Sequence, residues 1–388
     1  MEAYECAVCG SRDLEPLYPS GYQGMGVCSD FRLINGVRVE NRICRQCGLI
    51  FNAEGIRGNT KRFYNATYSL MRFKDDAAIR HFSETRQISQ AEQTRDVFFR
   101  LLFPKKKGRL LEVGAGKGDF LRCCREAISG WRITVLEPGE SFSYLVHKLR
   151  GVEAHRSDYK DYDIEKGTYD IIVALGVLEH VENPLDMLQW VHRGLNDGGA
   201  VFLRVPNFEK NPNDLFCVDH LSKLTVATLH GLAEKAGFAV MDVESAGVPV
   251  FAVLKKEKRV MPNDDEHTYN TNMKIAGANA VFAERAIKAI LKARETAARK
   301  REPFGIFGLA MSGIFAPIFS GFSPSDIAAY IDENKSFWGL RIHGRPVEGL
   351  GAIEEKKIRH IALTISPVYV KQVKEKLSRF RGLTVYVP

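Results

Sequence analysis

Short apolar runs alternate with amphipathic segments through the middle of the chain. The runs at 109–113 (RLLEV), 132–136 and 169–175 (YDIIVAL) have the apolar character of strands buried in a parallel sheet. Further strands are expected near 152–155 and at 198–206, with helical segments between the strands. Because strands and helices alternate, the pattern predicts an α/β fold with a doubly wound parallel sheet.

A second strand–helix pattern follows. Residues 267–301 are predicted to form one or two polar helices that connect the two patterns. The segment PFGIFGLAMSG (303–313) has the pattern of a strand and a glycine turn into a helix, and further strands are expected at 327–334, 360–365 and 383–388. This predicts a small second α/β unit, in which the glycine turn offers an anion site and Arg341, His343 and Arg345 add positive charge.

The N-terminal segment carries two C-x-x-C pairs, each followed directly by glycine. A C-x-x-C turn places two thiolates on one side of a tight loop, and two such turns supply the tetrahedral sulfur set that Zn²⁺ prefers. Disulfides or unrelated core thiols are the alternatives, and the absence of a secretory signal disfavours disulfides. A structural zinc site is therefore predicted at Cys6, Cys9, Cys44 and Cys47.

Composition limits the class of protein. The 388 residues are 45% hydrophobic and 26% charged, which suits a globular chain of two or three domains. There is no apolar run of 18 residues, so no membrane span is expected, and the predicted location is cytoplasmic. The net charge of +8 favours an anionic partner, a small substrate rather than a nucleic acid.

A glycine-rich turn follows the first strand of the central pattern. It reads E-V-G-A-G-K-G (112–118), and the next strand ends in Glu137, about 20 residues further on. An acidic side chain at that place can accept both hydrogen bonds of a ribose diol. A nicotinamide-binding dehydrogenase is the alternative, but its turn would read G-x-G-x-x-G.

Five segments in this order and spacing resemble class I S-adenosylmethionine-dependent methyltransferases: E-V-G-A-G-K-G, L-E-P, D-I-I-V-A-L-G-V-L-E-H-V, L-N-D-G-G-A-V-F-L-R-V-P and A-G-F. The resemblance implies S-adenosylmethionine as cofactor. It places the methionine part over the glycine turn, the ribose at the acidic residue, and the adenine beyond the third strand. The cofactor residues implied are Glu112, Gly114, Gly116, Gly118, Glu137, Pro138, Asp158, Tyr159 and Leu175.

The ends of the chain resemble a narrower family, zinc-binding three-part enzymes that include C-methyltransferases of nucleotide-linked deoxysugars. The phrase C-R-Q-C-G-L-I-F-N (44–52) is similar to the second cysteine turn of that family. The resemblance implies a zinc-binding module at 1–62, a methyltransferase domain at 63–265, and connector helices with a small Rossmann-like domain at 266–388. It also favours a substrate-gripping role for the last domain.

Methyl transfer to carbon or oxygen needs a base, and histidine suits this near neutral pH. His180 and His220 lie after strands, where open α/β sheets bind ligands, although a structural role is about as common for a single histidine. The sugar C-methyltransferases carry Y-H-E-H-F-S-Y at 217–223, with the last histidine proposed as base. This chain reads C-V-D-H-L-S-K, so the resemblance implies a base at His220, while methylation at carbon or at oxygen both stay open.

Further residues are predicted to assist. Asp219 is expected to orient His220 or bind a sugar hydroxyl, which requires a turn at that point. Tyr64 and Tyr68 lie where the family places aromatic residues over the active site, and Asn207 is a weaker candidate for substrate contact. At spacing i, i+4, the two tyrosines are also typical of simple helix packing.

The sequence thus predicts a methyltransferase acting on a small anionic acceptor, first of all a nucleotide-linked sugar. An O- or N-methyltransferase of another small metabolite is the alternative within this class. Two other classes are a zinc-dependent nucleic-acid-binding protein and a scaffold without activity. The residues leave open the acceptor, the acceptor atom and the oligomeric state.

Overall fold

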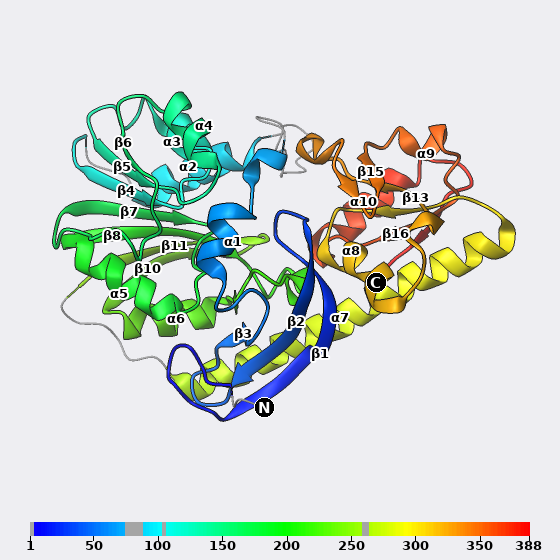
Figure 1. Cartoon of the computed structure of the whole chain (residues 1–388), viewed down its shortest axis with the longest axis horizontal. Helices are drawn as coiled ribbons and strands as arrows, with labels where there is room; N and C mark the ends of the chain where they lie inside the picture. Colours follow the sequence, from blue (N-terminus) through cyan, green and yellow to red (C-terminus); the bar gives the residue numbers. More distant parts are fainter. Residues whose placement is uncertain (1–3, 74–87, 103–105, 258–263) are drawn as a thin grey trace.

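The protein is described by a computed structural model that covers residues 4–73, 88–102, 106–257 and 264–388. Three sheets of four, seven and six strands form its framework. Figure 1 shows the seven-stranded sheet on one side, the six-stranded sheet on the other, and the N-terminal hairpin between them.

The N-terminal module is a long antiparallel hairpin. It comprises β1 (Leu14–Val27) and β2 (Leu33–Cys44), extended by β3 (Ile50–Asn52). Its fourth strand is β9 (Ser222–Lys223), which comes from far along the chain and pairs with β3. This strand pairing therefore joins the N-terminal module to the region that contains His220.

The seven-stranded sheet has the order β10-β11-β8-β7-β4-β5-β6. All five strands predicted from the apolar runs are present, and β11 is antiparallel to both of its neighbours, β8 and β10. The strands are β4 (Arg109–Val113), β5 (Arg132–Leu136), β6 (Glu153–His155), β7 (Tyr169–Leu175), β8 (Leu195–Pro206), β10 (Phe238–Glu244) and β11 (Pro249–Lys256).

Helices cover both faces of this sheet. Leu110 and Leu111 of β4 enter different cores because successive strand residues point to opposite faces. The first core receives α2 (Gln90–Leu102), α3 (Asp119–Cys124) and α4 (Ser141–Lys148), and the second receives α5 (Pro184–Gly194) and α6 (Val226–Lys235).

The connector is a single helix, α7 (Asp265–Lys300), which passes along the N-terminal hairpin to the last unit (Figure 1). The six-stranded sheet then follows in the order β14-β15-β13-β12-β16-β17. Its elements are β12 (Phe304–Phe307), α8 (Met311–Ser320), η3 (Pro324–Asp326), β13 (Ile327–Ile331), η4 (Lys335–Phe337), β14 (Arg341–Ile342), β15 (Arg345–Glu348), α9 (Ala352–Glu355), β16 (His360–Leu363), η5 (Pro367–Tyr369), α10 (Val370–Leu377) and β17 (Thr384–Tyr386).

One hydrophobic core crosses all three regions. It contains Ile43 of the hairpin, Phe216 of the 3₁₀ helix η2 (Pro212–Phe216), Ile290 of α7 and Phe315 of α8. The predicted limit at 62/63 falls within the short helix α1 (Thr60–Ala66), so the division into domains stays a prediction. In the described part of the chain, no helix has both the length and the apolar character needed to cross a membrane.

Candidate active site

The glycine turn after β4 has the backbone that a bound ligand needs. Gly114, Gly116 and Gly118 all have positive φ, at 67°, 56° and 77°. A Cβ added at Gly114 would lie 2.6 Å from Val177 Cγ2, and one at Gly116 would lie 2.8 Å from Leu70 Cδ1. Only glycine fits such positions, so the turn brings bare backbone to the carboxyl end of the sheet.

Glu137 lies directly beside this turn. Its carboxylate accepts hydrogen bonds from the backbone N–H of Gly116 (2.8 Å) and of Gly139 (2.9 Å). Burial raises the pKa of Glu137, and the two backbone N–H groups oppose that shift. The side chain is therefore held in one orientation at the end of β5, where the sequence predicts the ribose contact.

Glu112 is the clearest unsatisfied group of the site. It is 2% exposed, and its Oε2 atom has no hydrogen-bond partner among the described residues. Burial, together with the charge of Glu137, raises its pKa to about 8. An orphaned carboxyl oxygen beneath the glycine turn fits the ammonium group of a methionine-like ligand.

A short segment covers the turn. It consists of α1 and the 3₁₀ helix η1 (Leu70–Arg72), with Ser69 Oγ donating to Glu140 Oε2 at 2.6 Å. The carbonyl oxygen of Tyr64 lies 3.1 Å from where a Cβ on Gly139 would stand. Tyr64 belongs to this segment, and the closure of aromatic residues over the active site stays a prediction.

An open cavity of about 300 Å³ continues the site beyond Glu137. Its lining contains two predicted cofactor residues, Pro138 and Asp158. The other lining residues were not predicted from the sequence: Asn65, Arg156, Ser157 and Asp161. Tyr159 differs from its prediction, because it is 5% exposed and packs edge-on against Trp190 in the core instead of facing the cavity.

The two predicted histidines come together. Their ring centroids are 4.7 Å apart, although 40 positions separate His180 from His220 in the chain. His180 Nδ1 lies 2.6 Å from the hydroxyl of Tyr64 and 2.9 Å from the backbone oxygen of Asp219. The ring of Tyr68 lies 5.3 Å from that of Tyr64, so both predicted tyrosines belong to this cluster.

The acid that orients His220 is Asp214 and not Asp219. His220 Nδ1 is hydrogen-bonded to Asp214 Oδ1, which η2 brings beneath the imidazole. The carboxylate of Asp219 instead accepts bonds from the backbone N–H (2.7 Å) and hydroxyl (2.6 Å) of Ser29. The prediction that Asp219 orients His220 is therefore wrong. The Asp219 carboxylate also lies 3.5 Å from the Tyr64 hydroxyl and 3.7 Å from His180 Nδ1, so it belongs to the same cluster, and its contact with a sugar hydroxyl stays a prediction.

Charged groups within this cluster shift the pKa values of Asp214 and His220. Burial by itself would raise the pKa of Asp214, but the charges of His220 and Lys223 hold it below its usual value. Burial likewise would lower the pKa of His220, and Asp214 raises it instead. The pair therefore has the form of a base with an orienting carboxylate.

The central region of the chain, which contains this site, is similar to a known protein family. Residues 79–243, less than half of the chain, match a family model described as a methyltransferase domain. This region is a class I S-adenosylmethionine-dependent methyltransferase domain. The parallel strands β4 to β8 and the glycine turn with Glu112 and Glu137 lie within the matched residues.

Curated relatives match the methyltransferase domain over a short stretch. The ubiquinone biosynthesis O-methyltransferase of Marinobacter nauticus is 32% identical over 120 residues, covering 28% of this chain and 48% of that protein. That of Dechloromonas aromatica is 33% identical over 118 residues, covering 28% and 49%. The chain thus spans about half the length of the curated relatives that it matches.

Solved structures are similar at a lower level. An S-adenosylmethionine-dependent methyltransferase from Mesorhizobium loti has a TM-score of 0.36 at 16% identity, covering 42% of this chain and 97% of that chain. The phosphoethanolamine N-methyltransferase 2 of Haemonchus contortus has a TM-score of 0.34 at 20% identity, covering 39% and 37%. These values add no argument about the acceptor.

Asn207, at the end of β8, is held by backbone groups of the connection between the neighbouring strands. It is fully buried, and its Nδ2 donates to the backbone oxygens of Ser245 (2.9 Å) and Gly247 (3.0 Å). The side chain braces the turn between β10 and β11. Its Oδ1 atom is buried and has no hydrogen-bond partner among the described residues, and the predicted contact with substrate stays a prediction.

The four cysteines of the N-terminal module lie together beside the start and end of the hairpin. Cys6 and Cys47 Sγ are 3.6 Å apart, Cys9 and Cys44 Sγ are 3.5 Å apart, and all four sulfurs lie within 4.8 Å of one another. Zn–S bonds of about 2.3 Å give tetrahedral sulfur–sulfur distances of about 3.8 Å. The sulfur set therefore fits a zinc ion.

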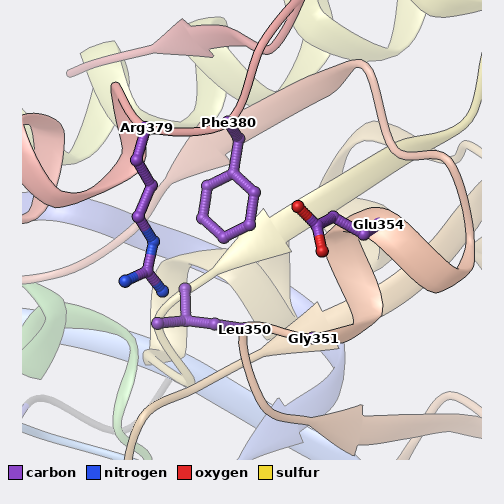
Figure 2. A pocket seen from close by; sticks show the side chains of 5 residues that line it. All are labelled: Leu350, Gly351, Glu354, Arg379 and Phe380. Carbon is purple, nitrogen blue, oxygen red and sulfur yellow. The ribbon is translucent and has the colours of Figure 1, made fainter.

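A second cavity, of about 310 Å³, lies in the six-stranded unit. Figure 2 shows Arg379 and Phe380 facing Leu350 and Glu354 across it. None of the residues predicted for the site lines this cavity, which sits between α9 and the end of α10.

Proposed function

We propose that the protein transfers a methyl group from S-adenosylmethionine to a hydroxyl group of a small anionic acceptor, with a nucleotide-linked sugar as the first candidate. The observation that carries this proposal is the buried Asp214–His220 pair beside His180. It supplies a base within the methyltransferase domain at the carboxyl end of the sheet, where acceptors of this fold bind.

His220 acts as the base through its second ring nitrogen. Because Nδ1 is bonded to Asp214, the carboxylate fixes the Nδ1–H tautomer and leaves Nε2 to take the proton of the acceptor. The same carboxylate stabilises the imidazolium that forms. His180 and Tyr64, joined at 2.6 Å, then form the neighbouring wall and orient the acceptor oxygen.

The cofactor is held by this chain's own turn and carboxylates. S-adenosylmethionine, when bound, supplies an electrophilic methyl group on a sulfonium. Glu112 would hold its amino group, Glu137 its ribose, and Pro138 and Asp158 the wall near its base. The segment of α1 and η1 excludes water above the turn.

Two features favour oxygen over carbon as the acceptor atom. Cys217 and Lys223 stand where the sugar C-methyltransferases carry tyrosines, and the Lys223 ammonium is committed to the carbonyls of Cys217 (2.8 Å) and His220 (2.9 Å). The curated relatives named above are also O-methyltransferases. The nucleotide link rests on the family resemblance and on the net charge of +8.

A structural zinc ion at Cys6, Cys9, Cys44 and Cys47 is part of the proposal. Four cysteines leave no open position for substrate, so the ion would stabilise the module and take no part in transfer. The β1–β2 hairpin provides the connection that the long interval between the two cysteine pairs requires.

A metal-assisted version of the reaction is the second candidate. Glu179, His180 and His220 each place one ligating atom within 4.8 Å of the others, and Glu179 Oε2 has no hydrogen-bond partner in the described part of the chain. In that version His220 would be a ligand instead of a base. Turnover that is lost on dialysis against a chelator and restored by one divalent cation would favour it.

The test is a product assay. The protein is incubated with methyl-labelled S-adenosylmethionine and a panel of nucleotide sugars, and products are analysed by mass spectrometry. A labelled O-methyl sugar nucleotide is expected, and its formation should fail with His220→Ala. If no member of the panel is methylated while another hydroxylated metabolite is, the sugar assignment is wrong and the O-methyltransferase assignment stands.

A further inference from the structure

The six-stranded unit has a topological switch point between β12 and β16. From β12 the chain moves to β13 on one side, and later returns to β16 on the other side. Open α/β sheets bind ligands outside the carboxyl ends of the strands at such a point. The substrate-gripping role that the family resemblance implies for this unit would therefore fall here.

Asn213 of η2 occupies this place. Its Nδ2 donates to the backbone oxygen of Thr364, which follows β16, at 3.0 Å. Its Oδ1 accepts from the backbone N–H of Ser312, in the first turn of α8, at 3.2 Å. Asn213 is 5% exposed, so one buried side chain satisfies both an acceptor and a helix N-terminal donor of the crevice.

Side chains of the same unit pack closely against the backbone of α8 at this place. A Cβ added at Gly313 would lie 3.0 Å from both Ile306 Cγ2 and Thr364 Oγ1. Thr364 Oγ1 itself donates to the backbone oxygen of Gly308 at 2.6 Å. The backbone groups of Thr364, Ser312 and Gly308 at the switch point thus have partners within the chain, whereas the buried Ser312 hydroxyl has no hydrogen-bond partner among the described residues.

The residue after Asn213 is Asp214, the partner of His220. The same 3₁₀ helix is also held from the N-terminal module, because Asn41 Nδ2 donates to the backbone oxygen of Leu215 at 2.9 Å. A second bond, from Ser366 Oγ to the backbone oxygen of Lys210 (2.5 Å), joins the six-stranded unit to the start of this loop. The position of the Asp214 carboxylate thus depends on contacts made outside the methyltransferase domain.

We propose that Asn213 is a positioning residue, and that the six-stranded unit acts through it as a clamp that holds Asp214 against His220. In this arrangement the switch-point crevice binds a side chain of its own chain in place of a nucleotide. The inference deepens the proposed function, but its geometry holds whatever acceptor is methylated.

The test is an NMR titration of the histidine side chains in the full chain, which needs no acceptor. Several charged or titratable groups surround the imidazole of His220, and none of them is substituted in the Asn213 variants: Asp214, Asp219, Glu179, His180 and Lys223. The His220 signal is assigned from its loss in His220→Gln.

In Asn213→Ala, the pKa of His220 should fall toward 6.5, because the carboxylate is no longer held against Nδ1. Asn211→Ala is the matched control, since Asn211 precedes η2 and its side chain makes no capping bond. Asn213→Ser, which retains one hydrogen-bonding group, provides the same readout if the alanine variant does not fold. A His220 pKa that is unchanged in a folded Asn213 variant overturns the clamp, and leaves the proposed function standing.

The Asn213 side-chain amide signals supply a second readout. Addition of uridine diphosphate to the wild-type chain should leave them unshifted if the crevice is filled internally. A saturable shift of these signals would show that a nucleotide displaces Asn213, and would overturn the proposal. Loss of methyl transfer in the product assay bears on neither NMR result, so the two failures are distinguishable.

Discussion

The imidazole of His220 is hydrogen-bonded through Nδ1 to the carboxylate of Asp214, six residues earlier in the same loop. Both side chains are nearly buried, with 9% of His220 and 2% of Asp214 exposed. A carboxylate in this position fixes the tautomer of the imidazole and raises its basicity. The reactivity of the site therefore depends on a loop and not on the sheet.

Asp214→Asn should lower kcat strongly, since the amide cannot stabilise the imidazolium. His220→Ala should lower kcat by about 10²- to 10⁴-fold, the usual contribution of a general base. S-adenosylmethionine affinity, measured by calorimetry, should remain near wild type in both variants. His230→Ala is the matched control, because this histidine is exposed on α6. Wild-type turnover in His220→Ala would exclude it as the base.

The pH dependence of kcat/KM should show an acidic limb with its midpoint above 6.5. Asp214 raises the pKa of His220 against the opposing effect of burial, so the proton stays bound to a higher pH. Since the base must be neutral, activity should increase as pH rises through that value. In Asp214→Asn the midpoint should move to lower pH while the plateau falls. A midpoint that does not respond to this substitution would contradict the pairing.

Glu137→Gln should weaken S-adenosylmethionine binding by about 10- to 100-fold, the range for loss of hydrogen bonds to a charged group. Glutamine keeps the size of the side chain but can no longer accept with both ends. Isothermal calorimetry measures the effect, and Glu126→Gln on the exposed surface is the control. An affinity equal to wild type would rule out the ribose contact.

Cofactor binding should release a proton from Glu112 near pH 7. The pKa of about 8 means that the free carboxyl is mostly protonated at pH 7, and a bound ammonium group favours the ionised form. Calorimetry in two buffers of different ionisation enthalpy detects the release, which should vanish near pH 9. Glu112→Gln should abolish it, whereas release that persists in this variant points to another group.

Metal analysis of the purified chain should find about one zinc per molecule. Cys44→Ser should lose the metal and lower the melting temperature, because an incomplete sulfur set leaves the hairpin ends unjoined. Cys123→Ser on α3 is the control, since this thiol lies outside the cluster. A folded, metal-free wild-type protein would exclude the zinc site.

Most of the strands were predictable because buried parallel strands are short apolar runs. β4 and β7 lie where the runs RLLEV and YDIIVAL stand, and the glycine turn follows β4 as expected. The edge strand β10 and its neighbour β11 were not predicted, and α7 is one helix where one or two were expected. Local composition does not decide how far a helix continues, because packing along its length does.

The candidate active site likewise has one part that could be predicted from the sequence and another part that could not. The sequence by itself determined the cofactor turn, with Glu112 and Glu137, because backbone conformation and strand ends are local properties. Only the tertiary structure decided that Asp214 orients His220, that Ser29 takes up Asp219, and that Tyr159 faces the core. The physical reason is that these side chains meet through loops, whose paths are fixed by contacts between distant segments of the chain.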